Sequence, residues 1–204
     1  PTLIRTFRDR FPAVAMEFRE SNAAELTESV GKGVVQVAIL RAPVAHPEGI
    51  AYVRLVDEPM LAILPLPHKL VVHGRKGHGF APIALRSLRT EGFILVRRPN
   101  APGMYADLVK ACARVGFTPR IVAEVNRMLI NVSLVAAGFG VSVVPSSMLG
   151  FHPDRVAYCP LRDAPELFAP LTLAWRTSEA DPAAGRFVAV AKELAAMRSI
   201  AKRH

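Results

Sequence analysis

Cysteine is scarce in this sequence of 204 residues, which contains only Cys112 and Cys159. Both lie among apolar neighbours and have no metal-ligand spacing, which argues against a disulfide framework and against a thiolate zinc site. They are typical of buried thiols in a reducing compartment. No secretory signal pattern is visible either, and we therefore expect a cytoplasmic protein.

Charged side chains are missing between Met128 and Pro153, although the chain carries 26 basic and 17 acidic residues. A membrane-spanning helix needs about 20 mostly apolar residues, but Gly138 interrupts this window. Asn131 and Ser142 would also need hydrogen-bond partners that lipid cannot supply. The window therefore predicts a protein interior, with a helix that ends at Gly138 followed by a short buried strand.

Enzyme and metal-site signatures are lacking too. The sequence has no nucleophile elbow, no His-Glu-x-x-His motif and no evident carboxylate pair, so we expect no catalysis. Three histidines share one loop, but Lys69, Arg75 and Lys76 beside them oppose a divalent cation. We expect neither a metal nor a cofactor. These histidines are His68, His73 and His78.

The net charge of +9 is spread along the chain and forms no basic stripe interleaved with aromatic residues. Sequence-independent nucleic-acid binding needs such a concentration of positive charge. We therefore interpret the charge as aiding solubility and steering anions, rather than as a DNA-binding surface.

The elements that are present alternate between short apolar runs and amphipathic helices, which predicts an α/β protein built from two similar units. Asn22 and Glu25 have N-terminal capping spacing, and Asp181 is the expected N-cap of the last helix. The expected strands cover residues 13–20, 34–40, 50–56, 59–65, 93–96, 120–125, 141–144, 156–161 and 171–176.

Six motifs occur in a characteristic order: LIRTFRDRFPAVAMEFRE, EPMLAILPLPHKL, EGFILVRR, ACARVGFTPRIVAEV, LVAAGFGVSVVPSSM and LTLAWR. Together they resemble the effector-binding domain of LysR-type transcriptional regulators over almost the whole chain. The resemblance implies an α/β, two-lobed fold of the type II periplasmic-binding-protein kind, with two Rossmann-like subdomains joined by crossing hinge strands and an inducer held between the lobes.

The same resemblance implies an organisation. Subdomain I would comprise residues 1–65 and 166–204, and subdomain II residues 66–165. A strand and a Ser- or Gly-bearing loop that begin the family's domain are missing ahead of Pro1, as is its winged helix-turn-helix DNA-binding domain. The implied function is inducer sensing that controls DNA binding by a full-length regulator. The alternative is a solute-binding protein that delivers a ligand to a transporter.

Candidate ligand contacts follow strand ends, because sites in open α/β sheets lie at the carboxyl ends of strands and helix N-termini attract anions. These ends carry several donors and no obvious acidic residue, which predicts a small organic anion such as a carboxylate. The candidate residues are Ser21, Asn22, Ala23, Arg41, Arg97, Arg98, Pro102, Gly103, Met104, Asn126, Val144 and Pro145.

Association is also expected, since the apolar face of the first helix is large for one small sheet to cover. The family pairs two such domains side by side, which implies a homodimer or tetramer with a two-fold interface. The expected interface residues are Leu3, Ile4, Phe7 and Phe11 of one subunit against Tyr105 and Leu108 of the other.

Overall fold

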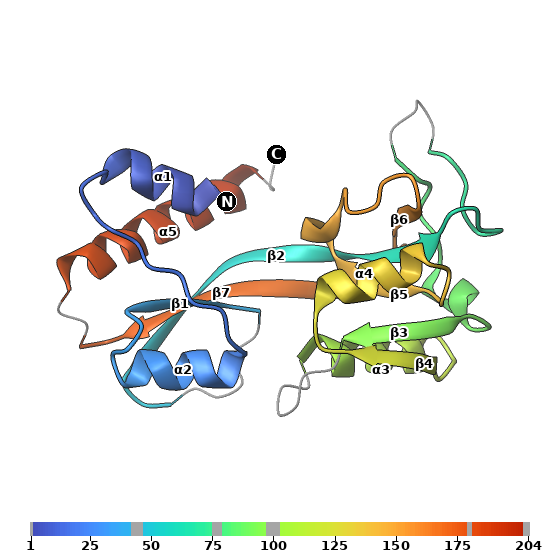
Figure 1. The fold of residues 1–204 in the computed structure, drawn as a ribbon, viewed down its shortest axis with the longest axis horizontal. Coiled ribbons are helices and arrows are strands. Elements are labelled where there is room, and N and C mark those ends of the chain that lie inside the picture. Colours follow the sequence, from blue (N-terminus) through green and yellow to red (C-terminus); the bar gives the residue numbers. More distant parts are fainter. Residues whose placement is uncertain (1, 42–46, 75–78, 97–102, 179–180, 202–204) are drawn as a thin grey trace. The chain divides into compact units, whose positions relative to one another are not determined.

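The computed structural model describes residues 2–41, 47–74, 79–96, 103–178 and 181–201 (Figure 1). The chain divides into two compact units. Unit 1 comprises Pro1–Asp57 with Pro170–His204, and unit 2 comprises Glu58–Ala169. The first boundary therefore lies within a strand after Asp57, rather than after Pro65 as the resemblance suggested.

Unit 1 contains three helices and parts of three strands among the described residues. β1 pairs with β7 in antiparallel register, from Val37 opposite Trp175 to Leu40 opposite Thr172, and β7 lies between β1 and β2. The elements are α1 (Thr2–Arg10), α2 (Ala23–Gly31), β1 (Val37–Leu40), β2 (Ile50–Pro65), β7 (Phe168–Arg176) and α5 (Pro182–Ala201).

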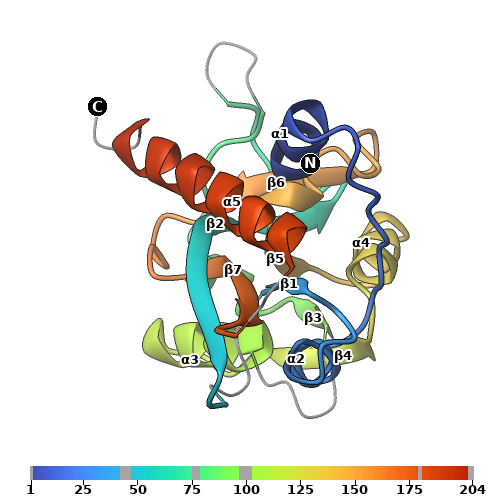
Figure 2. The same ribbon diagram turned by 90° about the vertical axis from the view of Figure 1, so that its left-hand side faces the viewer.

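Helices cover both faces of this small sheet. On one face, Phe7 of α1 packs against Phe187 of α5 with ring centroids 5.0 Å apart, above Leu173 of β7. On the other face, Val30 of α2 packs against Ala174. Figure 2 shows α1 alongside the longer α5. The alternation of side chains along β7 thus supplies two cores from one strand.

The expected strand at residues 13–20 does not form. This segment has no assigned secondary structure, although Val14 and Met16 pack against the α1–α5 core. The residues suit a strand, but a strand also needs a hydrogen-bonded neighbour. Within the described part of the chain, this segment has none.

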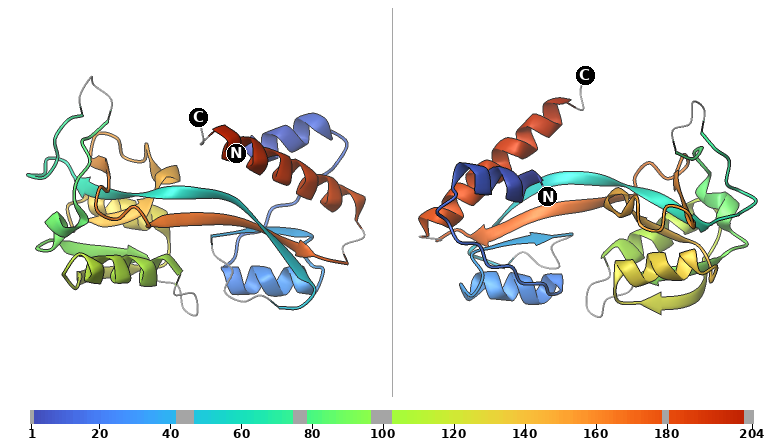
Figure 3. Two further views of the ribbon diagram at one scale, coloured as in Figure 1. Left: turned by 180° about the vertical axis from the view of Figure 1, so that it is seen from behind. Right: turned by 45° about the horizontal axis from the view of Figure 1, so that its top comes forward.

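Unit 2 is built around the second half of β2. Leu61–Ile63 pair on one side with β5 and on the other with β6, both antiparallel, while β3 and β4 pair in parallel. Figure 3 gives two further views of the ribbon. The other elements are β3 (Gly92–Val96), α3 (Gly103–Arg114), β4 (Arg120–Val125), α4 (Met128–Ala136), β5 (Ser142–Pro145) and β6 (Val156–Pro160). Two short 3-10 helices complete the unit, η2 (Leu85–Leu88) and η3 (Ser146–Met148).

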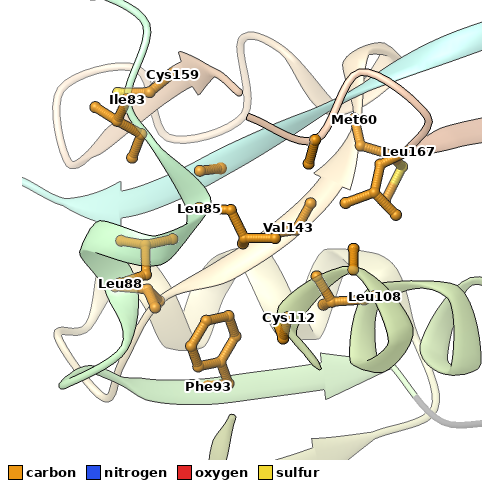
Figure 4. Close-up of a cluster of buried hydrophobic side chains, with 14 of the residues drawn as sticks. Met60, Ile83, Leu85, Leu88, Phe93, Leu108, Cys112, Val143, Cys159 and Leu167 are labelled. Carbon is orange, nitrogen blue, oxygen red and sulfur yellow. The ribbon is translucent and has the colours of Figure 1, made fainter. Parts of the chain in front are cut away.

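The larger core of unit 2 lies between these strands, α3 and η2 (Figure 4). Leu85 and Phe93 are fully buried there, together with the thiols of Cys112 and Cys159, which are free and not joined in a disulfide. Burial of each thiol raises its pKa, to about 12 for Cys112 and about 11 for Cys159, because the thiolate would lose its hydration. The buried thiols expected from the sequence are therefore confirmed.

A second core of unit 2 lies under α4. Ile63, Ile94 and Val144 pack there against Val132 and Val135 of the helix. Successive residues of β3 face opposite cores, since Phe93 and Leu95 belong to the first and Ile94 to the second. The charge-free window of the sequence thus contains α4 and β5, whose apolar side chains form much of this second core.

Local helix signals in the sequence are confirmed. The Asn22 side chain accepts a hydrogen bond from the Glu25 N–H at 2.9 Å, and Asp181 accepts one from the Ala183 N–H at 2.8 Å. Gly138 follows α4 with φ of 80°. Among the described residues, no helix combines the length and apolar character needed to cross a membrane.

Candidate functional site

Three strand ends of unit 2 point the same way. β3 and β4 are parallel, and the bridge between Phe93 and Val141 makes the start of the β5 stretch parallel to β3 as well. Each strand then leads towards a helical segment: β3 to α3, β4 to α4, and β5 directly to η3. The carboxyl edge of unit 2 therefore combines strand ends with helix starts, the usual location of ligand sites in α/β sheets.

The start of α4 has no side-chain cap. Its N-cap residue, Arg127, makes no side-chain capping hydrogen bond, and the first turn holds no acidic residue. The first backbone N–H groups of a helix have no partner within the helix, and the macrodipole favours negative charge there. Asn126, one of the predicted contacts, is exposed directly before this turn.

An acidic residue nevertheless lies near this edge. Glu124 of β4 faces Tyr105 of α3, whose hydroxyl is 3.5 Å from the carboxylate. The sequence argument, which found no obvious acidic residue at the strand ends, was wrong on this point. The carboxyl edge therefore holds one carboxylate beside the helix starts that lack acidic residues.

In unit 1, the predicted contacts Ser21, Asn22 and Ala23 lie at the start of α2. The Asn22 side chain is occupied by capping, and the Ser21 hydroxyl donates to the carboxylate of Glu25. Glu25 thus already places a negative charge in the first turn of this helix. Arg41 is half-buried just after β1.

Several other predicted contacts have different positions from those expected. Val144 is fully buried in the core under α4 and Pro145 is buried at the end of β5, so within unit 2 Val144 is a core residue and offers no surface to a ligand. Gly103 and Met104 are the first two residues of α3. Arg97, Arg98 and Pro102 lie outside the described residues.

The family model for the LysR substrate binding domain matches residues 1–196 of the chain. The protein belongs to this family. The mixed α/β structure agrees, because its fold is that of LysR effector-binding domains, which are periplasmic-binding-protein-like.

Curated relatives of this LysR domain are transcriptional regulators. It is 29% identical over 188 residues to the HTH-type transcriptional regulator AlsR of Bacillus subtilis, covering 92% of this chain and 59% of AlsR. It is 30% identical over 194 residues to the Hca operon transcriptional activator HcaR of Escherichia coli, covering 95% of this chain and 62% of HcaR. The LysR domain thus spans about three fifths of these relatives.

Among solved structures, the LysR domain matches the BenM effector binding domain with its effector benzoate. The TM-score is 0.80 at 22% identity, and the match covers 98% of this chain and 86% of that chain. At this identity the likeness shows the shared fold.

Two of the expected interface residues of the LysR domain are buried within their own units. Phe7 is 2% exposed and Leu108 is 3% exposed, so neither can supply much surface to a second subunit. Phe7 is buried because α5 covers the apolar face of α1, and Leu108 is buried because it packs into the larger core of unit 2. Leu3, Ile4, Phe11 and Tyr105 retain partial exposure.

A groove of about 310 Å³ in unit 1 of the LysR domain was missed by the sequence argument. It runs between the extended residues 14–19 and residues 34–39, above Phe7 and Phe187, and its lining is mostly apolar. Phe18 and Val34 are 66% and 53% exposed beside it. In the described ranges, no group of three or more His, Cys, Asp or Glu side chains could hold a metal ion.

Proposed function

We propose that this chain is the ligand-sensing domain of a LysR-type transcriptional regulator, and that it binds a small organic anion. The observation that carries the proposal is the family match over residues 1–196. Both curated relatives described above are transcriptional regulators, so delivery of a solute to a transporter is the less favoured function.

The anionic character of the ligand rests on the carboxyl edge of unit 2. The first turns of α3 and α4 contain no acidic residue, and no side chain caps α4. A carboxylate can accept hydrogen bonds from such free N–H groups and gains from the helix macrodipole. The solved BenM domain, which shares the fold, has benzoate as its effector, which makes an aromatic carboxylate a suitable first probe.

A thermal-shift titration with benzoate, and with the uncharged benzamide as matched control, tests the ligand class. We expect benzoate to raise the melting temperature and benzamide to leave it unchanged, because a ligand that binds only the folded state stabilises it by mass action. The same titration with other small carboxylates and with amines extends the test. Stabilisation by an amine and by no carboxylate would contradict an anion site.

Arg41 and Arg97, which follow predicted strands in the sequence, provide the corresponding variants. We expect Arg41→Ala or Arg97→Ala to weaken carboxylate binding by about tenfold, the effect of losing one charge-assisted hydrogen bond. Arg120→Ala is the matched control, because Arg120 begins β4 and so lies at its opposite end. Unchanged affinity in both strand-end variants would rule out these arginines as ligand contacts.

Control of transcription belongs to a longer protein in this proposal, since the chain spans about three fifths of its curated relatives. A helix-turn-helix domain outside this chain would bind promoter DNA, and ligand binding here would change that affinity. Gel-shift titrations of the longer protein with and without the carboxylate test this coupling. Identical DNA affinity at saturating ligand would refute it.

We also propose a homodimer, with the partly exposed residues of α1 in its interface. Leu3, Ile4 and Phe11 keep apolar surface after α5 has covered Phe7. Sedimentation velocity at high micromolar concentration should give the mass of two chains, and Ile4→Glu should shift it to one. A wild-type monomer under these conditions would contradict the interface.

A further inference from the structure

Two buried polar side chains meet at one backbone carbonyl in unit 2. Asn131 of α4 donates from Nδ2 to the Ile94 carbonyl oxygen at 2.9 Å, and Ser142 of β5 donates from its hydroxyl to the same oxygen at 2.6 Å. Asn131 is 0% exposed and Ser142 is 1% exposed. A carbonyl oxygen has two lone pairs, so these side chains fill the hydrogen-bonding capacity of Ile94.

The Ile94 carbonyl is available to side chains because β3 and the stretch that leads into β5 separate at this point. The Ile94 N–H donates to the Val141 carbonyl at 2.9 Å, and the Val141 N–H donates to the Gly92 carbonyl at 2.8 Å. The parallel pairing between these strands consists of a single bridge, between Phe93 and Val141. Beyond it, the Ile94 carbonyl is bonded by the side chains of Asn131 and Ser142, while β3 stays paired with β4.

An asparagine at position 131 is not the residue that stability alone would favour. Its Oδ1 atom is buried and has no hydrogen-bond partner among the residues that the structure describes, and a buried acceptor of this kind carries a desolvation cost. The surrounding residues of the α4 core are apolar, among them Val132, Val135 and Ile63. Departures from local stability of this kind are expected mainly at functional sites.

The position of this cluster links it to the carboxyl edge. Ile94 lies two residues before Val96, where β3 ends, and Asn131 lies in the first turns of α4, whose start carries the exposed Asn126. We propose that Asn131 and Ser142 are positioning residues, which hold the end of β3 against α4 and so set the geometry of the ligand contacts at this edge. This inference rests on the proposed function, because it assigns a role within the same site.

Asn131→Leu separates positioning from stability. Leucine has a similar volume, removes the unpartnered acceptor and leaves Ser142 to satisfy the Ile94 carbonyl, so we expect the melting temperature to stay the same or rise. Affinity for benzoate is expected to fall about tenfold, the loss that corresponds to one misplaced hydrogen bond. A residue with a merely structural role would lose stability and affinity together.

Ser142→Ala removes the second hydrogen bond to the Ile94 carbonyl with a smaller change in side chain. It replaces Asn131→Leu in the test if that variant does not fold. Ser87→Ala is the matched control, because the Ser87 hydroxyl also donates to a backbone carbonyl, that of Ala84 at 2.5 Å, but in η2. We expect benzoate affinity to fall in Ser142→Ala and to remain at the wild-type value in Ser87→Ala.

Hydrogen exchange gives a readout that needs no ligand. In Asn131→Leu, the amides of Leu95 and Val96 and the hydrogen-bonded amides of residues 131–134 in α4 should exchange about tenfold faster, while those of β6 stay unchanged. If the wild-type chain binds none of the carboxylates, the proposed ligand class fails and exchange alone decides the positioning role. Wild-type exchange in Asn131→Leu, or an affinity loss that follows the loss of stability, would overturn the inference.

Discussion

Gly140→Ala is expected to lower the free energy of unfolding by about 2–4 kcal/mol. A Cβ atom at this position would lie 2.4 Å from the Gly92 carbonyl oxygen and 3.3 Å from Cγ2 of Val122. The first contact is with backbone, which no rotamer change can relieve. The Gly92 carbonyl also accepts a hydrogen bond from the Val141 N–H at 2.8 Å. Moving this carbonyl away from the new Cβ atom would therefore break a hydrogen bond between the two strands.

Gly185→Ala provides the control for replacing glycine in general. A Cβ atom there meets nothing within 4 Å, and the residue lies on the exposed side of α5. Alanine should stabilise this helix by up to about 1 kcal/mol. Urea unfolding of both variants measures the difference, and a Gly140→Ala protein as stable as the wild type would show that β3 and the β5 stretch need no such close approach.

The close approach at Gly140 also bears on the candidate site. Gly92 and Gly140 bring the two strands together just before they part at Ile94. The position of the carboxyl edge of unit 2 therefore depends on a glycine contact at one end and on the Asn131–Ser142 cluster at the other. We expect Gly140→Ala to weaken carboxylate binding as well as stability, whereas Asn131→Leu should weaken binding without lowering the melting temperature.

Local signals made the fold class predictable. The Asn22–Glu25 pair and Asp181 mark helix starts by contacts within four residues, and Gly138 marks a helix end by a conformation that glycine adopts without strain. Signals of this kind need no tertiary information. The order of helices and strands, and with it the α/β class, could therefore be predicted from the sequence.

Features that depend on distant residues were not predictable in the same way. Residues 13–20 have strand-forming side chains but find no neighbour among the described residues, and the sequence cannot show whether a neighbour exists. Two expected strands are one continuous β2, because its pairing with β5 and β6 begins at Met60 and Leu61, just after Pro59. Pro59 therefore does not have to donate to either ladder.

The candidate site was predicted in part. Helix starts after strands could be located from sequence, so the α4 start near Asn126 was anticipated. The need of Asn131 and Ser142 for hydrogen-bond partners was also evident from their apolar surroundings. Their common partner is the carbonyl of Ile94, 37 residues from Asn131 and 48 from Ser142. Only the packing of α4 and β5 against β3 reveals that the two requirements are met at one atom.

The unfolding free energy is expected to fall by about 2–3 kcal/mol between pH 8 and pH 10 because of the two buried thiols. Burial raises the pKa of Cys112 from its ordinary value of 9.0 to about 12, and that of Cys159 to about 11. Below pH 8 both thiols are protonated in the folded and the unfolded chain, so their contribution is fully present. Above the unfolded value, only the unfolded chain ionises, and each thiol then favours unfolding.

The double variant Cys112→Ala/Cys159→Ala isolates this effect. It should be less stable than the wild type at pH 7, because two side chains are shortened inside the larger core of unit 2. Its stability should nevertheless change less between pH 8 and pH 10, since the groups responsible for the wild-type slope are gone. Tyr52 and Tyr158 also have raised pKa values through burial, but their ordinary value of 10.0 places their contribution at higher pH. Urea unfolding under reducing conditions at half-unit pH steps gives both curves, and parallel curves would show that the thiols ionise as readily in the folded protein as in the unfolded chain.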